Sequence, residues 1–284
     1  MTVESAPALV DTHCHLDDGE FDADRAAVLQ RARDAGVMRI IVPAIDAANW
    51  PRLRAVCAAE AGLSAAYGLH PLYLPAHRPA DLDALREWIA RERPVAVGEC
   101  GLDHFVELDH DMQLGYFDAQ LRTARDFDLP VIVHARRAVD AVIAAIRRVG
   151  GLRGVVHSFS GSPQQAEQLW RLGFLLGIGG PVTYARANRL RGLVAAMPLE
   201  YLLLETDAPD QPDATHRGQR NEPARLPRVL AAIASLRGET TTAIAAATTR
   251  NARQLFGLPP EPGGETTAES SAGDRWKPAA SRNA

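Results

Sequence analysis

Eight short apolar runs alternate with eight amphipathic stretches along most of the chain, and this alternation constrains the fold more than any other feature. The runs are often β-branched and end in Gly, Pro or polar residues, which predicts strands near 8–12, 37–43, 64–69, 94–99, 130–135, 153–158, 174–179 and 200–206. The stretches between them have helical periodicity and cover 22–35, 46–60, 80–91, 110–127, 138–149, 163–172, 187–196 and 222–237. Strands that are apolar along their whole length indicate a parallel sheet covered by helices. Closure into an α/β fold of the (β/α)₈ TIM-barrel type is the simplest such arrangement.

The length and composition suit one barrel. The chain has 284 residues, of which 46% are hydrophobic and 23% charged, so it can bury a large core. A further helix near 239–250, followed by the segment NARQLF, would cap the barrel. We therefore predict a single domain over 1–258. The remainder, 259–284, is rich in Gly, Pro, Ser and Thr, and we expect it to be a disordered polar tail.

Composition also indicates the cellular compartment and limits the kinds of partner that the chain can bind. The first ten residues are neither basic nor strongly apolar, and no stretch approaches the roughly 20 apolar residues that span a bilayer. The three cysteines are widely separated and form no CxxC pair, which favours a reducing cytoplasm. A net charge of -4 excludes the basic footprint of a tight, sequence-independent duplex binder. We expect a cytoplasmic enzyme with no membrane attachment and no obligate protein partner.

Seven side chains of metal-binding type lie at the ends of the apolar runs, and they are His13, His15, His70, Glu99, His134, His157 and Asp207. Because parallel strands of a barrel all end at one mouth, we expect these side chains to converge there, where the active sites of this architecture lie. The pair His13-X-His15 would point both imidazoles to one face of a strand, and Asp11 on the same face would orient an imidazole.

Each of these residues also has an ordinary structural interpretation. His134 or His157, taken alone, is as compatible with a hydrogen-bonded core histidine, and Asp207 with a turn cap. His70 precedes a proline and is equally compatible with a structural role. Glu99 is different, because a glutamate in the apolar strand VAVGE is costly unless it is paired or bound to metal.

The scarcity of lysine restricts the chemistry. The only lysine is Lys277, in the polar tail, so a Schiff base, a Walker lysine and a carboxylated bridging lysine are all excluded from the folded body. Any bridge between two metal ions must therefore be a carboxylate.

The segments that carry these residues resemble the TatD family of metal-dependent hydrolases, most closely its YjjV-type branch. They are DTHCHLD, GLHP, GECGLD, PVIVHARR, HSFSGS and LLLETDAPD, followed by NEPARLP and NARQLF, and they span about residues 9–258. The resemblance implies a TIM-type barrel of the amidohydrolase superfamily with two divalent metal ions. It implies that His13, His15 and Asp207 hold one ion, that His134 and His157 hold the second, and that Glu99 bridges the two.

Three positions depart from the family pattern. Asp210 stands where many members that cleave DNA have an aromatic residue, Ser158 where Cys is common, and His104 where Tyr is frequent. None is an implied ligand, so these departures bear on the substrate and not on the chemistry.

The implied ligands suit Zn²⁺ or Mn²⁺ more than Mg²⁺, although the identity of the metal stays open. A metal-bound water would be acidified and would attack phosphorus or a carbonyl carbon. Asp207 would take the proton of that water and pass it to the leaving group, with Glu99 as the second catalytic carboxylate.

Arg136 is the candidate for binding an anionic group of the substrate, with a salt-bridged rim arginine as the alternative. His70 is a second candidate for contacting substrate.

The sequence leaves several functions open. The first is a phosphodiesterase of the deoxyribonuclease type, acting on DNA or another anionic ester. The alternative is a hydrolase of a small-molecule or aminoacyl ester or amide bond with the same dimetal site. A metal-bearing module without turnover is disfavoured by the complete ligand set. Base stacking would require aromatic residues near the mouth, and the candidates are Tyr73, Phe105, Phe159 and Tyr184.

Overall fold

The computed structural model describes residues 8–259, and within them eight parallel strands form one sheet. Each strand pairs with the next one along the chain, so the order of the strands in the sheet, β1 to β8, is their order in the sequence. The strands are β1 (Leu9–Asp11), β2 (Val37–Pro43), β3 (Leu63–Tyr67), β4 (Ala96–Asp103), β5 (Val131–Arg136), β6 (Gly154–Val156), β7 (Phe174–Ile178) and β8 (Leu202–Leu204). All eight coincide with the predicted runs.

The sheet closes on itself between its first and last strands. The backbone N–H of Thr12 donates to Leu204 O at 3.0 Å, and the N–H of Asp207 donates to His13 O at 2.9 Å. A parallel bridge between Cys14 and Ala208 continues this contact past the strand ends. The predicted TIM-type barrel is therefore confirmed, and its closing seam runs directly into the segments that carry His13 and Asp207.

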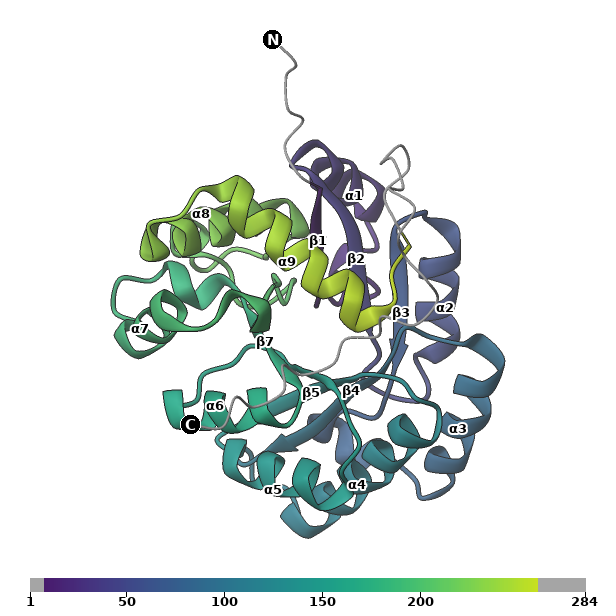
Figure 1. Cartoon of the computed structure of the whole chain (residues 1–284). Coiled ribbons are helices and arrows are strands. Elements are labelled where there is room, and N and C mark those ends of the chain that lie inside the picture. Colours follow the sequence, from purple (N-terminus) through teal and green to yellow (C-terminus); the bar gives the residue numbers. More distant parts are fainter. Residues whose placement is uncertain (1–7, 260–284) are drawn as a thin grey trace, which may run out of the picture.

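Helices surround the strands, as the alternating pattern predicts (Figure 1). They are α1 (Arg25–Asp34), α2 (Trp50–Ala59), α3 (Ala80–Glu92), α4 (His110–Asp126), α5 (Val139–Val149), α6 (Pro163–Arg171), α7 (Asn188–Ala196), α8 (Leu226–Arg237) and α9 (Thr241–Phe256). Among residues 8–259, no helix has both the length and the apolar character needed to cross a membrane. The predicted tail lies, apart from Pro259, outside the described residues.

Three helices begin three or four residues later than predicted, namely α1 at Arg25, α2 at Trp50 and α8 at Leu226. The predicted helix over 222–237 begins only at Leu226, because the amide of Asn221 binds the carbonyls of Thr206 and Asp210 and holds this segment in the loop. The predicted cap of a helix near 239–250 plus NARQLF is one continuous helix, α9.

The core lies inside the barrel and between the strands and their helices. Val131, Ile132 and Val133 of β5 are all buried, so both faces of this strand are covered. Helix α5 buries one face, which includes Val142 and Ile146, and turns its polar face outward. This arrangement explains why the strands are apolar throughout while the helices are amphipathic.

Strands β4 and β5 pair over a longer stretch than expected. A side chain at Gly101 would place its Cβ only 2.0 Å from His134 O, and Gly101 has a φ of 147°, so glycine permits the close pairing. The register continues through Gly101 with His134 to Asp103 with Arg136. Glu99 and His134 were predicted at the ends of strands over 94–99 and 130–135, and the strands continue past them, to Asp103 and Arg136.

The closing helix α9 is tied to the entry of β8 by one buried amide. Asn251 Nδ2 donates to Leu199 O at 2.8 Å and to Leu202 O at 2.9 Å. We expect Asn251→Ala to lower the free energy of unfolding by about 2–4 kcal/mol, because one buried and one partly buried carbonyl lose their donor. Urea denaturation would measure this loss. Arg250→Ala, at an exposed position of the same helix, should change it by less than about 0.5 kcal/mol. Equal effects of the two variants would contradict the role of Asn251.

Candidate metal centre

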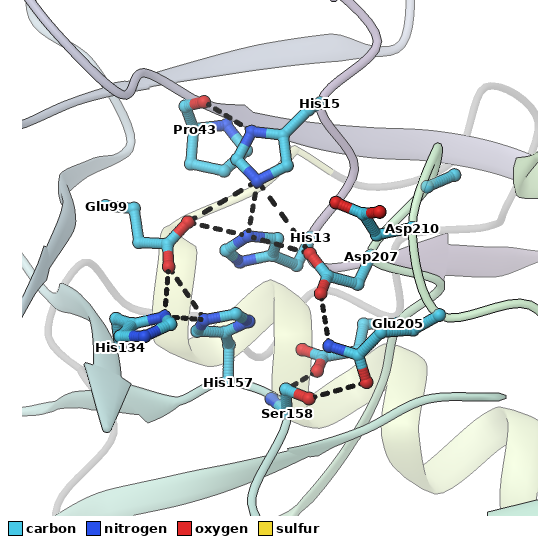
Figure 2. A network of polar contacts seen from close by, with 12 residues as sticks. His13, His15, Pro43, Glu99, His134, His157, Ser158, Glu205, Asp207 and Asp210 are labelled. Atoms are coloured by element: carbon cyan, nitrogen blue, oxygen red, sulfur yellow. Dashed lines mark hydrogen bonds and ion pairs between the residues drawn. The ribbon is translucent and has the colours of Figure 1, made fainter. Parts of the chain in front are cut away.

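The six implied metal ligands lie together at the C-terminal mouth of the barrel (Figure 2). They come from five different strands or the loops that follow them, and they are His13, His15, Glu99, His134, His157 and Asp207. All of them except His13 line a cavity of about 670 Å³, which we call the catalytic cavity. His13 is fully buried beneath it.

Glu99 lies between two groups of histidines, and each of its carboxylate oxygens faces one group. Oε2 lies 3.0 Å from His13 Nε2 and 3.5 Å from His15 Nε2. Oε1 lies 2.7 Å from His157 Nε2 and 3.0 Å from His134 Nδ1. Glu99 therefore belongs to two groups of side chains that could each hold a metal ion.

Asp207 belongs to the first of the two groups. Its Oδ1 lies 3.5 Å from His13 Nε2 and 3.8 Å from His15 Nε2. The other carboxylate oxygen accepts a hydrogen bond from the side-chain amide of Gln211. Asp207 has a φ of 57°, in the left-handed region that few residues with a side chain adopt, so the loop after β8 aims this carboxylate at the cavity.

The hydrogen bonds of two histidines show which nitrogen atoms face the centre. His15 Nδ1 lies 3.3 Å from Pro43 O, and His134 Nε2 lies 2.9 Å from Asp103 Oδ2. Since these nitrogens donate to oxygen, the opposite nitrogen of each neutral ring presents a lone pair to the centre. His15 Nε2 is then only 3.3 Å from His13 Nε2, and His134 Nδ1 only 3.2 Å from His157 Nε2. Such a convergence of imidazole nitrogens around a carboxylate fits divalent metal ions.

The electrostatics of the cluster favour positive charge. Burial alone would raise the pKa of Glu99, but His157, His70 and His13 outweigh it and hold that pKa well below its usual value. Burial alone would lower the pKa of His157, yet Glu99 and Asp207 raise it to about 10. A site that stabilises a proton on a buried imidazole also stabilises a metal cation, which competes with that proton.

His70 contacts Glu99 in a different way. Its Nδ1 accepts from the backbone N–H of Leu72 at 3.1 Å, so Nε2 carries the proton and donates to Glu99 Oε1 at 2.9 Å. Burial lowers the pKa of His70 to about 4, which keeps the ring neutral. This tautomer leaves no lone pair on Nε2 for a metal ion. His70 lines the catalytic cavity, so its predicted contact with substrate stays a prediction.

Sequence reasoning assigned no role to two buried acids of this site. Asp103, within the GECGLD segment, accepts from His134 Nε2 and is fully buried. Glu205 accepts from the backbone N–H of Ser158 at 2.5 Å, and it lies close enough to His13 and His157 to share a cation with them. The only available signal was an acidic residue in an otherwise apolar strand, the same signal that identified Glu99.

Asp11 acts differently from the expectation. It was expected to orient an imidazole, but its carboxylate accepts from the backbone N–H of His13 at 3.3 Å and of Thr206 at 3.0 Å. It also accepts from the Thr206 hydroxyl at 2.6 Å. Asp11 therefore holds together the two backbone segments of the closing seam.

Two buried glutamines of α4 fix two loops of the site. Gln120 accepts from the N–H of Leu69 at 2.7 Å and donates to its carbonyl at 3.1 Å, next to His70. Gln113 binds the N–H and the carbonyl of Asp103 in the same way, at 2.8 and 3.1 Å. Seven residues apart, the two amides lie on one face of the helix. They were not predicted, because they sit in a helix whose sequence reads as amphipathic.

The rim of the catalytic cavity is asymmetric in charge. Arg136 lines it from the β5 side, with its Cζ 3.7 Å from the centre of the exposed Phe105 ring and no ion pair to any described carboxylate. No ion pair supports the alternative of a salt-bridged rim arginine, although Arg136 lies close enough to Asp103 to lower the pKa of that carboxyl. The β1 and β8 side carries Asp18, Glu20 and Asp210. Of the three departures from the family pattern, Asp210 and Ser158 line this cavity, whereas His104 lines a neighbouring one.

Comparison with known proteins agrees with this geometry. Residues 10–257 match the family described as TatD related DNase. The chain is 45% identical to the metal-dependent hydrolase YjjV of Escherichia coli, over 88% of this chain and 98% of that protein. The crystal structure of YjjV superposes with a TM-score of 0.84 at 44% identity, covering 88% of this chain and 98% of that one.

More distant relatives widen the comparison. A protein of Pantoea sp. named 3'-5' ssDNA/RNA exonuclease TatD is 35% identical over 88% of this chain and 100% of its own length. The phosphotriesterase homology protein of Escherichia coli shares the fold, with a TM-score of 0.65 at 13% identity over 89% of this chain and 99% of that one.

The contact between Asp103 and His134 yields a test of the metal centre. We expect Asp103→Asn to lower the affinity for a divalent metal by about 10- to 100-fold, because His134 loses the carboxylate that orients it and increases its basicity. Competition with a chromogenic chelator would measure the affinity. Glu107→Gln, an exposed change in the following loop, is the matched control and should leave it unchanged. An unchanged affinity in Asp103→Asn would remove Asp103 from the site.

Proposed function

The chain belongs to the TatD family of metal-dependent hydrolases, and from that premise we propose that it hydrolyses phosphodiester bonds at the ends of single-stranded nucleic acid. The observation that carries this proposal is Glu99, whose two oxygens face two separate groups of ligands on the floor of an open cavity. Two cations held in this way suit phosphoryl transfer, where charge develops on both the attacking and the leaving oxygen.

We assign the ligands as the family resemblance implies. His13, His15 and Asp207 would hold one ion, His134 and His157 would hold the second, and Glu99 would be a ligand of both. When bound, the ions supply an acidified water and polarise the oxygen of the scissile group. Asp207 has one oxygen toward His13 and His15, so it is placed to accept the proton of the attacking water and return it to the leaving group. His70 holds Glu99 through a neutral imidazole N–H and lines the catalytic cavity, which makes it a candidate for contact with substrate.

The rim supports a nucleic-acid substrate at two points. Arg136 offers a guanidinium without a carboxylate partner, which is suited to bidentate contact with phosphate. Tyr73 lines the catalytic cavity, is 40% exposed and is available for stacking against a base. Phe105 is 48% exposed, but Arg136 and Arg137 already stack on its ring. Phe159 is only 2% exposed, and the Tyr184 hydroxyl donates to Pro212 O, so these two aromatics are less accessible. The relative from Pantoea bears the name of an exonuclease on single strands.

A second candidate is supported by the acidic side of the rim. Asp18, Glu20 and Asp210 line the cavity opposite Arg136 and would attract a positively charged group. A small-molecule or aminoacyl ester or amide, whose ammonium group would contact these acids, fits the same dimetal site. Parallel assays of the metal-loaded protein on a phosphodiester and on a panel of esters and amides distinguish the two. Turnover of the esters alone would overturn the phosphodiesterase proposal.

The bridging role of Glu99 predicts a change in metal content. We expect Glu99→Ala to abolish hydrolysis and to lower bound metal from about two equivalents to about one or less, since both ions lose a shared ligand. Elemental analysis of the purified variant would measure the content. Glu200→Ala, at an exposed acid near the start of β8, should retain both metal and activity. Two ions and full turnover in Glu99→Ala would mean that this carboxylate is structural.

A substitution at Arg136 tests substrate binding separately from the hydrolysis step. We expect Arg136→Ala to reduce kcat/KM for phosphodiesters by about 10- to 100-fold, which corresponds to a charge-assisted contact of about 1.5–3 kcal/mol. Neutral esters should be hydrolysed at nearly the original rate, because they present no anionic oxygen to the guanidinium. Steady-state kinetics on both substrate classes would decide. If both slow equally, Arg136 supports the site structurally and the case for an anionic substrate loses this support.

A further inference from the structure

A second cavity opens beside the catalytic cavity and shares Ser160 with it. Its volume is about 430 Å³, and its polar lining includes His104, Arg137, Asp140 and Arg189. We call it the side cavity. We infer that it binds the phosphate adjacent to the scissile one, so that the preferred substrate is a strand with at least two phosphodiesters. This inference rests on the proposed function and specifies which substrates that function favours.

Two consecutive arginines serve the two cavities. Arg136 lines the catalytic cavity and Arg137 lines the side cavity. Both guanidiniums lie over the exposed ring of Phe105, with Cζ 3.7 Å and 4.6 Å from its centre. Stacking on a ring holds a guanidinium in place while leaving its N–H groups free to donate. Neither arginine forms an ion pair with a described residue, so both remain available to an anion.

The opposite wall of the side cavity presents a third guanidinium. Arg189, near the start of α7, donates from Nη2 to Ser160 O at 2.6 Å. That bond fixes Arg189 beside the residue that the two cavities share and engages only one of its five N–H groups. His104 stacks on His110 with ring centres 4.1 Å apart, and its imidazole adds one further donor to the lining.

The charge of the side cavity favours an anion. Asp140 is the one carboxylate in its lining, and its Oδ1 already accepts from Gln165 Nε2 at 2.8 Å. The two positive charges of Arg137 and Arg189 exceed the single negative charge of Asp140 by one. The other side of the rim of the catalytic cavity carries Asp18, Glu20 and Asp210, which repel phosphate. A polyanionic strand with its terminal phosphodiester at Glu99 therefore continues toward the side cavity.

Kinetics on substrates with one and two phosphates test this inference. Bis(4-nitrophenyl) phosphate has one phosphate, and a thymidine trinucleotide has two internal ones. We expect Arg137→Gln and Arg189→Gln each to raise KM for the trinucleotide by about 10-fold or more, through loss of a charge-assisted contact. Values of kcat for the trinucleotide, and all constants for the one-phosphate substrate, should change less than about twofold. The slope of log KM against log salt should decrease by about one.

Three further measurements separate a binding role from a structural one. Arg137→Lys should recover part of the lost affinity, because it restores the charge. Asp140→Asn should act in the opposite direction and lower KM for the trinucleotide, since it removes the single carboxylate. Arg250→Gln on α9, whose contacts lie at the other end of the barrel, is the matched control and should have no effect. Fluorescence anisotropy with a hydrolysis-resistant phosphorothioate trinucleotide provides a readout without turnover.

The outcomes distinguish this inference from the function on which it rests. If the protein hydrolyses the one-phosphate substrate but the Arg137 and Arg189 variants affect both substrates equally, or neither, the side cavity does not bind phosphate. If the metal-loaded protein hydrolyses neither phosphodiester, the proposed function fails together with the inference.

Discussion

The burial of one carboxylate, that of Glu99, is the constraint on which the mouth of the barrel depends. A charged carboxylate without solvent is costly, and here five imidazoles lie within 3.5 Å of its two oxygens. These imidazoles lie in or just after β1, β3, β5 and β6, so Glu99 is compensated only when the ends of these strands converge correctly. The same negative charge makes the cluster a site for cations, because it raises the pKa of His157 to about 10 against the effect of burial. Structural compensation and metal binding therefore have one physical origin.

A second layer of hydrogen bonds keeps these imidazoles in place. Gln113 on α4 holds the backbone of Asp103, Asp103 holds His134, and His134 faces Glu99. Gln120, seven residues further along the same helix, holds the loop of His70 in the same way. One helix outside the barrel thus sets the position of two histidines inside its mouth. This coupling makes the geometry of the metal centre sensitive to changes in α4 that touch no ligand.

Around the metal ligands, the mouth of the barrel has an uneven distribution of charge. Acids line the side of β1 and β8, and arginines without carboxylate partners line the side of β5 and α7. The departure at Asp210 contributes to the acidic side, and the departure at His104 lies in the side cavity. Members of a family with identical metal ligands can therefore differ in substrate, because selectivity resides in loops that the ligand set does not constrain. On the proposed function, this asymmetry would direct an anionic strand toward the side cavity.

The sequence by itself determined the features that repeat along the chain or that carry a large energetic cost. Apolar periodicity predicted all eight strands, because strands covered on both faces must be apolar throughout. Glu99 could be singled out because an acid in an apolar strand requires compensation. The tertiary structure alone decided the features that depend on a partner distant in the chain. The carboxylate of Asp103 orients His134, 31 residues away, and Asp11 joins segments 195 residues apart. Likewise, neighbouring Arg136 and Arg137 line two different cavities, since backbone direction and packing, which composition does not encode, determine where each side chain lies.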